Sequence, residues 1–401
     1  MIRKLTIGLV ILALSITVTP SITVGAQSGP RVVDTSVEID FPSLLQFNLT
    51  TESQVNIKDI RLNYTVERIS YATVISEVFV QFTPHKNVTV SWIWDMKRTG
   101  GLPPGTEIKY WWLITDDNNL TYETTPTTIS FDDHRYTWNK INSGEIFLYW
   151  YEGGNSFAEE LLSAAQQALT WLELNTGAKL LQAVNLYIYD PGDLLGAMIY
   201  PQEWTGGVAF TRYGTIAIGI SPGNLAWGKR AIAHELTHLV IHQLTFNAYD
   251  GLPTWLDEGL ATNTEGELNP GYARSLNEAI KTRELLPVRS LASPFSSETN
   301  LALLSYAQSY SIVNFMIDKY GQGSILELLN TFQKGMSYDE ALLEVYGFDM
   351  SELERRWLSS LEESPTFQRY QTIVIIVVSS IVGLALLLYL ESLIIKRRRK
   401  R

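Results

Sequence analysis

Residues 233–242 read Ala-His-Glu-Leu-Thr-His-Leu-Val-Ile-His and contain three of the five histidines in the 401-residue chain. A helical pattern runs over 225–244, and on a helix His234 and His238 project from one face one turn apart. Two imidazoles so placed can hold a single zinc ion. Glu235, beside the first of them, can reach a water molecule and act as its general base. The stretch therefore predicts a hydrolytic metal site with one Zn²⁺ per chain.

The third ligand of this predicted site must lie elsewhere in the chain. His242 is a further helical turn along, about 6 Å away, which is too far to share one ion through bonds of about 2 Å. We therefore expect His242 to pack or to support the ligands. Glu258 is the best candidate, because the Pro-Thr pair at 253–254 suits a helix start. That helix would place the Glu258 carboxylate opposite the two histidines.

Composition narrows the classes of protein that are possible. The chain has no cysteine, which excludes disulfides, thiolate zinc ligands and thiol nucleophiles, so a metal site must use His, Asp or Glu. The net charge is −11, but eight basic residues and only one acidic residue lie at the two ends. The intervening chain has 23 basic and 41 acidic residues, a net charge of −18. This argues against a nucleic acid as partner.

Apolar segments lie at both ends of the chain. Two basic residues precede an N-terminal apolar run that ends near small residues, which predicts a signal peptide over 1–26, with an uncleaved anchor helix as the alternative. Residues 372–395 are almost all apolar and long enough to predict a transmembrane helix. The basic residues 396–401 follow and predict a cytoplasmic tail. We therefore expect a single-pass membrane protein with its catalytic domain outside the cytoplasm.

The chain between these segments changes character near residue 140. Residues 30–140 contain short alternating runs separated by turn signals, which are typical of an all-β sandwich. The stretch 102–112 resembles the start of a strand in immunoglobulin-like or fibronectin-like modules. Residues 143–364 combine a few strand patterns with a mostly helical second half, an α+β arrangement. The predicted fold class is multidomain: an Ig-like β-sandwich, an α+β catalytic domain and a single C-terminal transmembrane helix.

The individual patterns set the expected elements of these two domains. Strands are expected at 55–57, 60–66, 78–82, 88–94, 108–114, 127–131, 184–189, 206–210 and 215–220. Helices are expected at 156–174, 225–244, 254–264, 272–282, 306–320, 324–334, 337–346 and 350–363.

The chain around the histidines resembles the gluzincin metallopeptidases, and specifically the peptidase MA-like domain related to the aminopeptidase catalytic core. The likeness covers about residues 145–363. It rests on Ala-His-Glu-Leu-Thr-His at 233–238, Trp-Leu-Asp-Glu-Gly-Leu-Ala at 255–261 and Tyr-Ala-Gln-Ser-Tyr-Ser-Ile-Val at 306–313. The three motifs together, in this order and spacing, are far more specific than any one alone. The resemblance implies a thermolysin-type catalytic fold and a protein or peptide substrate.

The resemblance also implies roles for particular residues. The implied zinc ligands are His234, His238 and Glu258, with Glu235 as general base. Tyr306 matches the tyrosine whose hydroxyl stabilises the oxyanion, a role that suits a neutral donor. Tyr310, one turn further on, is the alternative, and core packing is the alternative for either tyrosine.

Supporting and substrate-binding residues are implied in the same way. Glu265 and Asp257 are rivals for accepting a hydrogen bond from a ligand imidazole. The stretch 204–210 resembles the edge strand beside the cleft, where Gly206 and Gly207 would permit close approach of an extended peptide. Aminopeptidases of this clan have a Gly-x-Met-Glu-Asn element there, and this chain lacks it. The departure favours an endopeptidase or an undefined specificity.

We therefore expect a membrane-anchored, extracytoplasmic zinc metallopeptidase. The alternative is a non-catalytic surface binding or adhesion protein on the same scaffold, in which zinc is structural or absent. Such a protein would need neither Glu235 nor a tyrosine donor. The sequence leaves the oligomeric state and the physiological substrate open.

Overall fold

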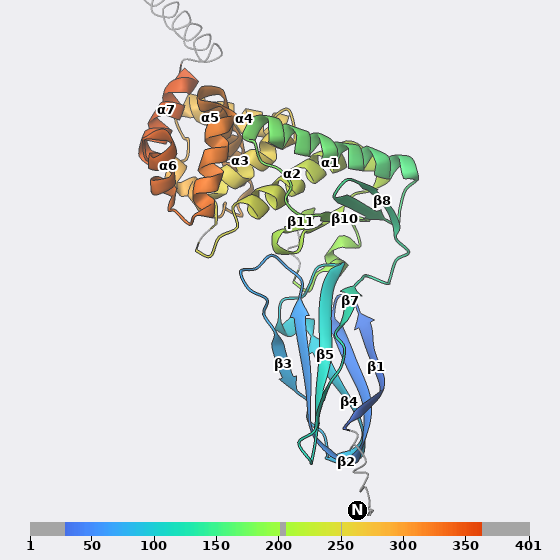
Figure 1. Ribbon diagram of the computed structural model, residues 1–401. Coiled ribbons are helices and arrows are strands. Elements are labelled where there is room, and N and C mark those ends of the chain that lie inside the picture. Colours follow the sequence, from blue (N-terminus) through green and yellow to red (C-terminus); the bar gives the residue numbers. More distant parts are fainter. Residues whose placement is uncertain (1–28, 201–205, 250, 363–401) are drawn as a thin grey trace, which may run out of the picture.

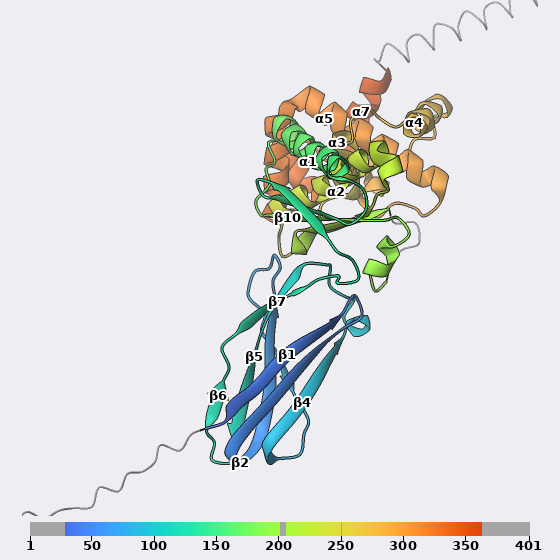
Figure 2. The ribbon, with the colours of Figure 1, turned by 90° about the vertical axis from the view of Figure 1, so that its right-hand side faces the viewer.

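The computed structural model describes residues 29–200, 206–249 and 251–362. Figures 1 and 2 show an elongated all-β domain joined end-on to a second domain, in which helices cover one face of a sheet. An all-β region followed by a largely helical one agrees with the multidomain organisation predicted from the sequence. The likeness of the first domain to immunoglobulin-like or fibronectin-like modules stays a prediction.

The β domain is built around one 23-residue strand, β2. Its strands are β1 (Arg31–Asp40), β2 (Leu44–Val66), β3 (Ser76–Phe79), β4 (His85–Asp95), β5 (Thr106–Asp116), β6 (Thr121–Glu123) and β7 (Thr127–Phe131). The first half of β2 pairs with β1 and β4, and the second half pairs with β3 and β5. The two strands predicted at 55–57 and 60–66 are therefore parts of one strand, which pairs with two different sets of strands along its length.

A register irregularity between residues 52 and 59 reverses which side chains of β2 point inward. Before it the buried residues are Leu45, Phe47, Leu49 and Thr51, and after it they include Ile60 and Leu62. An inserted residue changes the buried positions from odd to even in this way. The apolar residues of both sets pack in one hydrophobic core, so the two halves of the strand enclose the centre of the sandwich.

The second domain contains a mixed five-stranded sheet in the order β11-β12-β10-β9-β8. Its strands are β8 (Asn139–Ser143), β9 (Ile146–Trp150), β10 (Val184–Tyr189), β11 (Gly207–Phe210) and β12 (Thr215–Gly219). The inner three run parallel, and the two edge strands run antiparallel to their neighbours. Sequence patterns predicted β10, β11 and β12 but missed β8, which is mostly polar, and β9, which has no alternation to recognise.

Seven α-helices are described in the second domain. They are α1 (Asn155–Thr176), α2 (Leu225–Leu244), α3 (Thr254–Thr264), α4 (Pro270–Thr282), α5 (Thr299–Gln333), α6 (Tyr338–Tyr346) and α7 (Met350–Glu362). The two helices predicted at 306–320 and 324–334 form the single element α5, kinked at Gly321, whose φ is 79°. The other predicted helices lie within a few residues of the observed ones. Helix α3 packs between α2 and α5, which positions it beside the predicted metal site.

Each face of the five-stranded sheet contributes to a different hydrophobic core. On β10, Leu186 and Ile188 pack against the helices, whereas Tyr187 and Tyr189 pack with the core of the β domain. The hydroxyl of Tyr189 donates a hydrogen bond to the buried carboxylate of Asp133 at 3.1 Å. The two domains are therefore joined through a packed interface rather than through a linker alone.

The predicted fold class included a membrane-spanning helix, and this part of the prediction is wrong for the residues that the structure describes. Within the described ranges, no helix is both long enough and apolar enough to cross a membrane. A span needs about 20 consecutive apolar residues, whereas these helices turn one apolar face to the core and polar residues to the other side. The predicted signal peptide (1–26), transmembrane helix (372–395) and basic tail (396–401) lie outside the described residues. The extracytoplasmic location stays a prediction.

The close packing of α3 on α5 depends on Gly259. A Cβ atom at this position would lie 2.6 Å from the backbone oxygen of Ser309 and 2.6 Å from Cγ2 of Val313. We expect Gly259→Ala to lower the free energy of unfolding by about 1–3 kcal/mol, because the two helices must move apart. Chemical denaturation measures the loss. The control is Gly323→Ala on α5, where a Cβ meets nothing within 4 Å; equal losses in both variants would contradict the prediction.

Candidate active site

The packing of α2 against the core positions the two histidines that are predicted to be ligands. Its residues Ile232, Leu236 and Leu239 are fully buried in the helix-side core. This packing turns the neighbouring face of α2, with His234 and His238, toward Glu258 of α3. The Nε2 atoms of the two imidazoles lie 3.2 Å apart.

Two threonines join α2 to α3 beside these histidines. The hydroxyl groups of Thr237 and Thr264 hydrogen-bond to each other at 2.7 Å. Both also lie within hydrogen-bond distance of the carbonyl oxygen of Ala233, at 2.7 and 3.1 Å. All three residues are buried, so these contacts hold α3 alongside the turn of α2 that carries the ligands.

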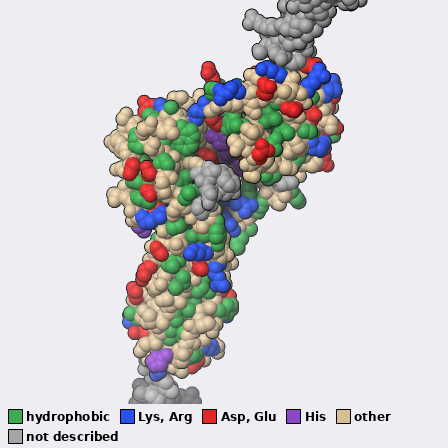
Figure 3. Space-filling model, turned by 180° about the vertical axis from the view of Figure 1, so that it is seen from behind, with side chains coloured by type: hydrophobic (Ala, Val, Ile, Leu, Met, Phe, Trp, Pro, Cys, Tyr) green, Lys and Arg blue, Asp and Glu red, His purple; other side chains and the backbone are tan. Residues whose placement is uncertain are grey.

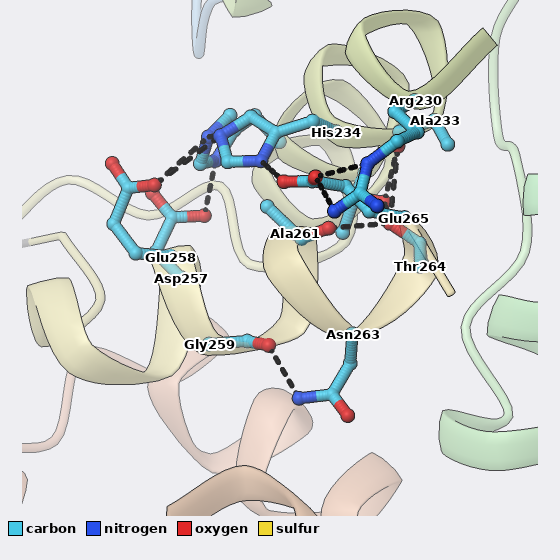
Figure 4. Close-up of polar contacts among 12 residues, drawn as sticks. Arg230, Ala233, His234, Asp257, Glu258, Gly259, Ala261, Asn263, Thr264 and Glu265 are labelled. Carbon is cyan, nitrogen blue, oxygen red and sulfur yellow. Dashed lines mark hydrogen bonds and ion pairs between the residues drawn. The ribbon is translucent and has the colours of Figure 1, made fainter. Parts of the chain in front are cut away.

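Three possible ligand atoms converge between α2 and α3 (Figure 4). Oε2 of Glu258 lies 3.3 Å from Nε2 of His234 and 3.6 Å from Nε2 of His238. Donor atoms about 2.0–2.2 Å from a tetrahedral zinc ion lie about 3.3–3.6 Å from one another. This Glu258 oxygen is buried and accepts no hydrogen bond of good geometry from the described residues. The donor set and its spacing therefore fit zinc.

Each of the two histidines is oriented by a carboxylate of its own. Nδ1 of His234 donates to Glu265 at 2.9 Å, and Nδ1 of His238 donates to Asp257 at 2.8 Å. A carboxylate only accepts, so Nδ1 holds the hydrogen and Nε2 of the neutral ring has its lone pair free for a metal. The sequence left Glu265 and Asp257 as rivals for one role, and the structure places one at each histidine.

The two orienting carboxylates are held in turn by nitrogen donors on α2. Nε and Nη2 of Arg230 donate to Oε2 of Glu265 at 3.1 and 2.9 Å, and Nε2 of His242 donates to Oδ2 of Asp257 at 2.9 Å. Sequence reasoning left His242 as a packing or supporting residue and missed Arg230. The sequence did contain a signal for Arg230, because this residue lies four positions before His234 and therefore on the same helix face.

The carboxylates and imidazoles change one another's titration. Burial lowers the pKa of His234, but Glu258 and Glu265 outweigh it and raise that pKa to about 9. Burial also lowers the pKa of His238, which Asp257 and Glu258 raise well above its usual value. For Glu258 burial raises the pKa, but the two histidines lower it to about 2. Opposite charges in this group therefore stabilise one another, and a bound cation would take the place of the protons on the histidines.

A cleft of about 650 Å³ opens over the metal group, which consists of His234, His238 and Glu258. In Figure 3 histidine and acidic side chains gather in a hollow on the face opposite that of Figure 1. Glu235 of α2 and Gly207 of β11 both line the cleft. A Cβ at Gly207 would lie 3.3 Å from Oε1 of Glu235, so the missing side chain leaves room for the carboxylate. Gly206, in contrast, lies against Trp227 and is not among the described lining residues.

Tyr306 of α5 also lines the cleft. Its ring stacks on Tyr272 at 5.8 Å, meets Phe295 edge-on at 5.1 Å, and lies 6.5 Å from the ring of His234. Burial, together with the charge of Glu258, raises the pKa of Tyr306. Its hydroxyl is therefore a neutral hydrogen-bond donor at ordinary pH. Tyr310 is not among the described residues that line the cleft.

Part of the chain, including the candidate site, matches a known protein family. Residues 164–363 match the model of the Peptidase MA superfamily. The matched part includes α2, α3 and α5 and so contains every residue of the metal group. The match supports a peptidase as the class of protein. The match agrees with the resemblance at the level of the superfamily, while the gluzincin type stays a prediction. No curated protein matches the chain significantly.

Solved structures with similar parts include two proteins of bacteria. OgpA from Akkermansia muciniphila is 17% identical, with 29% of this chain and 31% of that chain covered and a TM-score of 0.21. An aminopeptidase N family protein from Idiomarina loihiensis is 13% identical, with 81% of this chain and 70% of that chain covered and a TM-score of 0.28. The chain thus spans about a third of the length of OgpA.

The orienting carboxylates are expected to raise the affinity for zinc. We expect Glu265→Gln or Asp257→Asn to weaken zinc binding by about 10–100-fold, because a neutral amide orients and polarises the imidazole less well than a carboxylate. Competition with a chromogenic chelator measures the affinity. Glu267→Gln removes an exposed charge two residues from Glu265 and serves as the control. An unchanged affinity in both orienting variants would contradict the prediction.

Proposed function

We propose that the chain is a zinc-dependent peptidase that hydrolyses peptide bonds of proteins or peptides. The observation that carries the proposal is the convergence of His234, His238 and Glu258 at separations of 3.2–3.6 Å, beneath a cleft that Glu235 and Tyr306 also line. A structural zinc site would need neither of these last two residues.

The proposed roles follow from the positions of the side chains. His234, His238 and Glu258 would hold the zinc ion, which supplies a Lewis acid that polarises the scissile carbonyl and lowers the pKa of water. Glu235 takes a proton from the attacking water and returns it to the leaving amine. The neutral hydroxyl of Tyr306 donates a hydrogen bond to the oxyanion as charge develops there.

The edge of β11 supports an extended peptide as substrate. The amide of Gly219 on β12 donates to the carbonyl of Gly206 at 3.0 Å. Bonded pairs alternate in an antiparallel ladder, so the amide and carbonyl groups of Gly207 and Ala209 point away from β12. Among the described strands β11 has no partner on that side. A peptide can therefore pair with this edge and pass over Glu235.

The general base provides the first test. We expect Glu235→Gln to bind zinc as the wild type does but to cleave an unstructured protein about 10²–10⁴-fold more slowly, because the amide cannot accept the proton. Metal content by emission spectrometry and cleavage by gel or mass spectrometry measure the two properties. His234→Ala is the comparison and should lose both zinc and activity. A wild-type chain that holds zinc and cleaves nothing would favour the non-catalytic alternative.

The oxyanion donor provides the second test. We expect Tyr306→Phe to lower kcat by about 10²–10³-fold with little change in KM or zinc content, because only the transition state loses a hydrogen bond. Tyr310→Phe is the matched control on the same helix, and its kinetics should equal those of the wild type. Loss of kcat in Tyr310→Phe instead would assign the role to the other tyrosine.

A further inference from the structure

The β domain contributes to the cleft that lies over the metal group. Residues 100–102 lie in the connection between the short helix η1 (Met96–Arg98) and β5, and they line the cleft together with residues 197–200. Leu102 is only 9% exposed and belongs to the core of the β domain. One wall of the cleft is therefore continuous with the hydrophobic core of the sandwich.

This wall is held in place by several contacts. The carbonyl oxygen of the fully buried Met96 accepts hydrogen bonds from three consecutive amides, those of residues 99–101, at 3.0–3.1 Å. The hydroxyl of Tyr200 donates to the carbonyl of Lys97 at 2.6 Å. A Cβ at Gly101 would lie 2.8 Å from Cγ1 of Ile199, so the two segments are in close contact. The wall is thus part of the folded domain interface.

The chemistry of the wall differs from that of the metal group. The charged or imidazole side chains among the described cleft-lining residues are those of the metal group, of Glu235, and of Asp257 and His242 beside the metal group. Most of the other side chains that line the cleft are apolar: those of Leu102, Ala197, Met198, Ile199, Val208 and Phe210. Met198, Ile199 and Phe210 are partly buried and pack against the core of the β domain. The cleft therefore combines a polar centre with an apolar side.

A peptide bound at β11 would present side chains to both sides in turn. Successive residues of a strand point to opposite faces. On β11 itself, Ala209 packs with the helix-side core and Phe210 packs with the core of the β domain. A paired substrate strand follows the same alternation. Where one of its residues faces α2 and Glu235, the next faces the apolar wall.

We propose that the wall of Leu102, Met198, Ile199 and Phe210 is a specificity subsite, which receives an apolar side chain of the substrate close to the scissile bond. The inference rests on the proposed peptidase function and gives the β domain a role in choosing substrates. Burial of an apolar side chain there is favourable, whereas a charged one would lose its hydration without gaining a partner.

The test is the cleavage profile of the full chain, loaded with zinc, on a peptide library. At one position beside the cleaved bond we expect the wild type to favour Leu, Ile, Phe or Met over Lys and Arg by about tenfold or more. Ile199→Glu places a carboxylate on the wall, and we expect it to abolish or reverse this preference at that position alone. Zinc content should stay at the wild-type value, and a cooperative thermal transition should show that the variant is folded.

Two further variants make the result interpretable. Ile93→Glu introduces the same charge at a 53% exposed isoleucine of β4 outside the cleft, and its profile should equal that of the wild type. If Ile199→Glu does not fold, Ile199→Ala enlarges the subsite and should shift the preference toward bulkier apolar residues.

The outcomes separate this inference from the function on which it rests. Cleavage by the wild type without an apolar preference at any position would overturn the subsite alone. So would an unchanged profile, or a uniform loss over all sequences, in the folded Ile199 variants. A zinc-loaded wild type that cleaves no peptide would overturn the proposed function and the subsite with it.

Discussion

The site depends on the close approach of α3 to α2 and α5. Gly259 lets the backbone of α3 pack directly against α5, and the buried hydroxyls of Thr237 and Thr264 tie α3 to α2 one turn from the ligands. With both contacts in place, Glu258 lies within 3.6 Å of both imidazoles. A metal site tolerates little error in such positions, because its bonds are about 2 Å long. The packing of three helices is thus what makes three separate residues a single binding group.

The same approach creates an electrostatic problem that the surrounding residues solve. Burying carboxylates is unfavourable unless they are paired and hydrogen-bonded. Here Asp257 lies between His238 and His242, and Glu265 lies between His234 and Arg230. The imidazoles of His234 and His238 therefore each lie between the proposed metal position and a carboxylate, and that carboxylate in turn contacts a nitrogen donor. This arrangement orients the rings before a metal binds and needs no thiolate, in a chain that has no cysteine.

The five-stranded sheet gives the site its surroundings. Its helix-side face supports α2, and its other face packs on the β domain, so β11 at its edge lies where the two domains meet. The cleft consequently collects residues from both domains and from distant parts of the chain, at positions 100–102, 197–200, 207–211, 234, 235, 238, 242, 257, 258 and 306. A β domain joined only by a flexible linker could not contribute a wall to this cleft. The polar centre and the apolar wall are two consequences of one sheet that serves two cores.

Local patterns in the sequence were sufficient for the helix with His234 and His238 and for Glu258 as the candidate third ligand, because helical spacing and a helix start are properties of a few neighbouring residues. They were not sufficient to assign Asp257 and Glu265, since that choice depends on the rotation of α3 against α2. Nor could they join both halves of β2 into one strand or place residues 100–102 beside the metal group. The sequence by itself determined the chemistry available at the site, while only tertiary packing decided which side chains meet, because contacts between distant segments depend on the whole core.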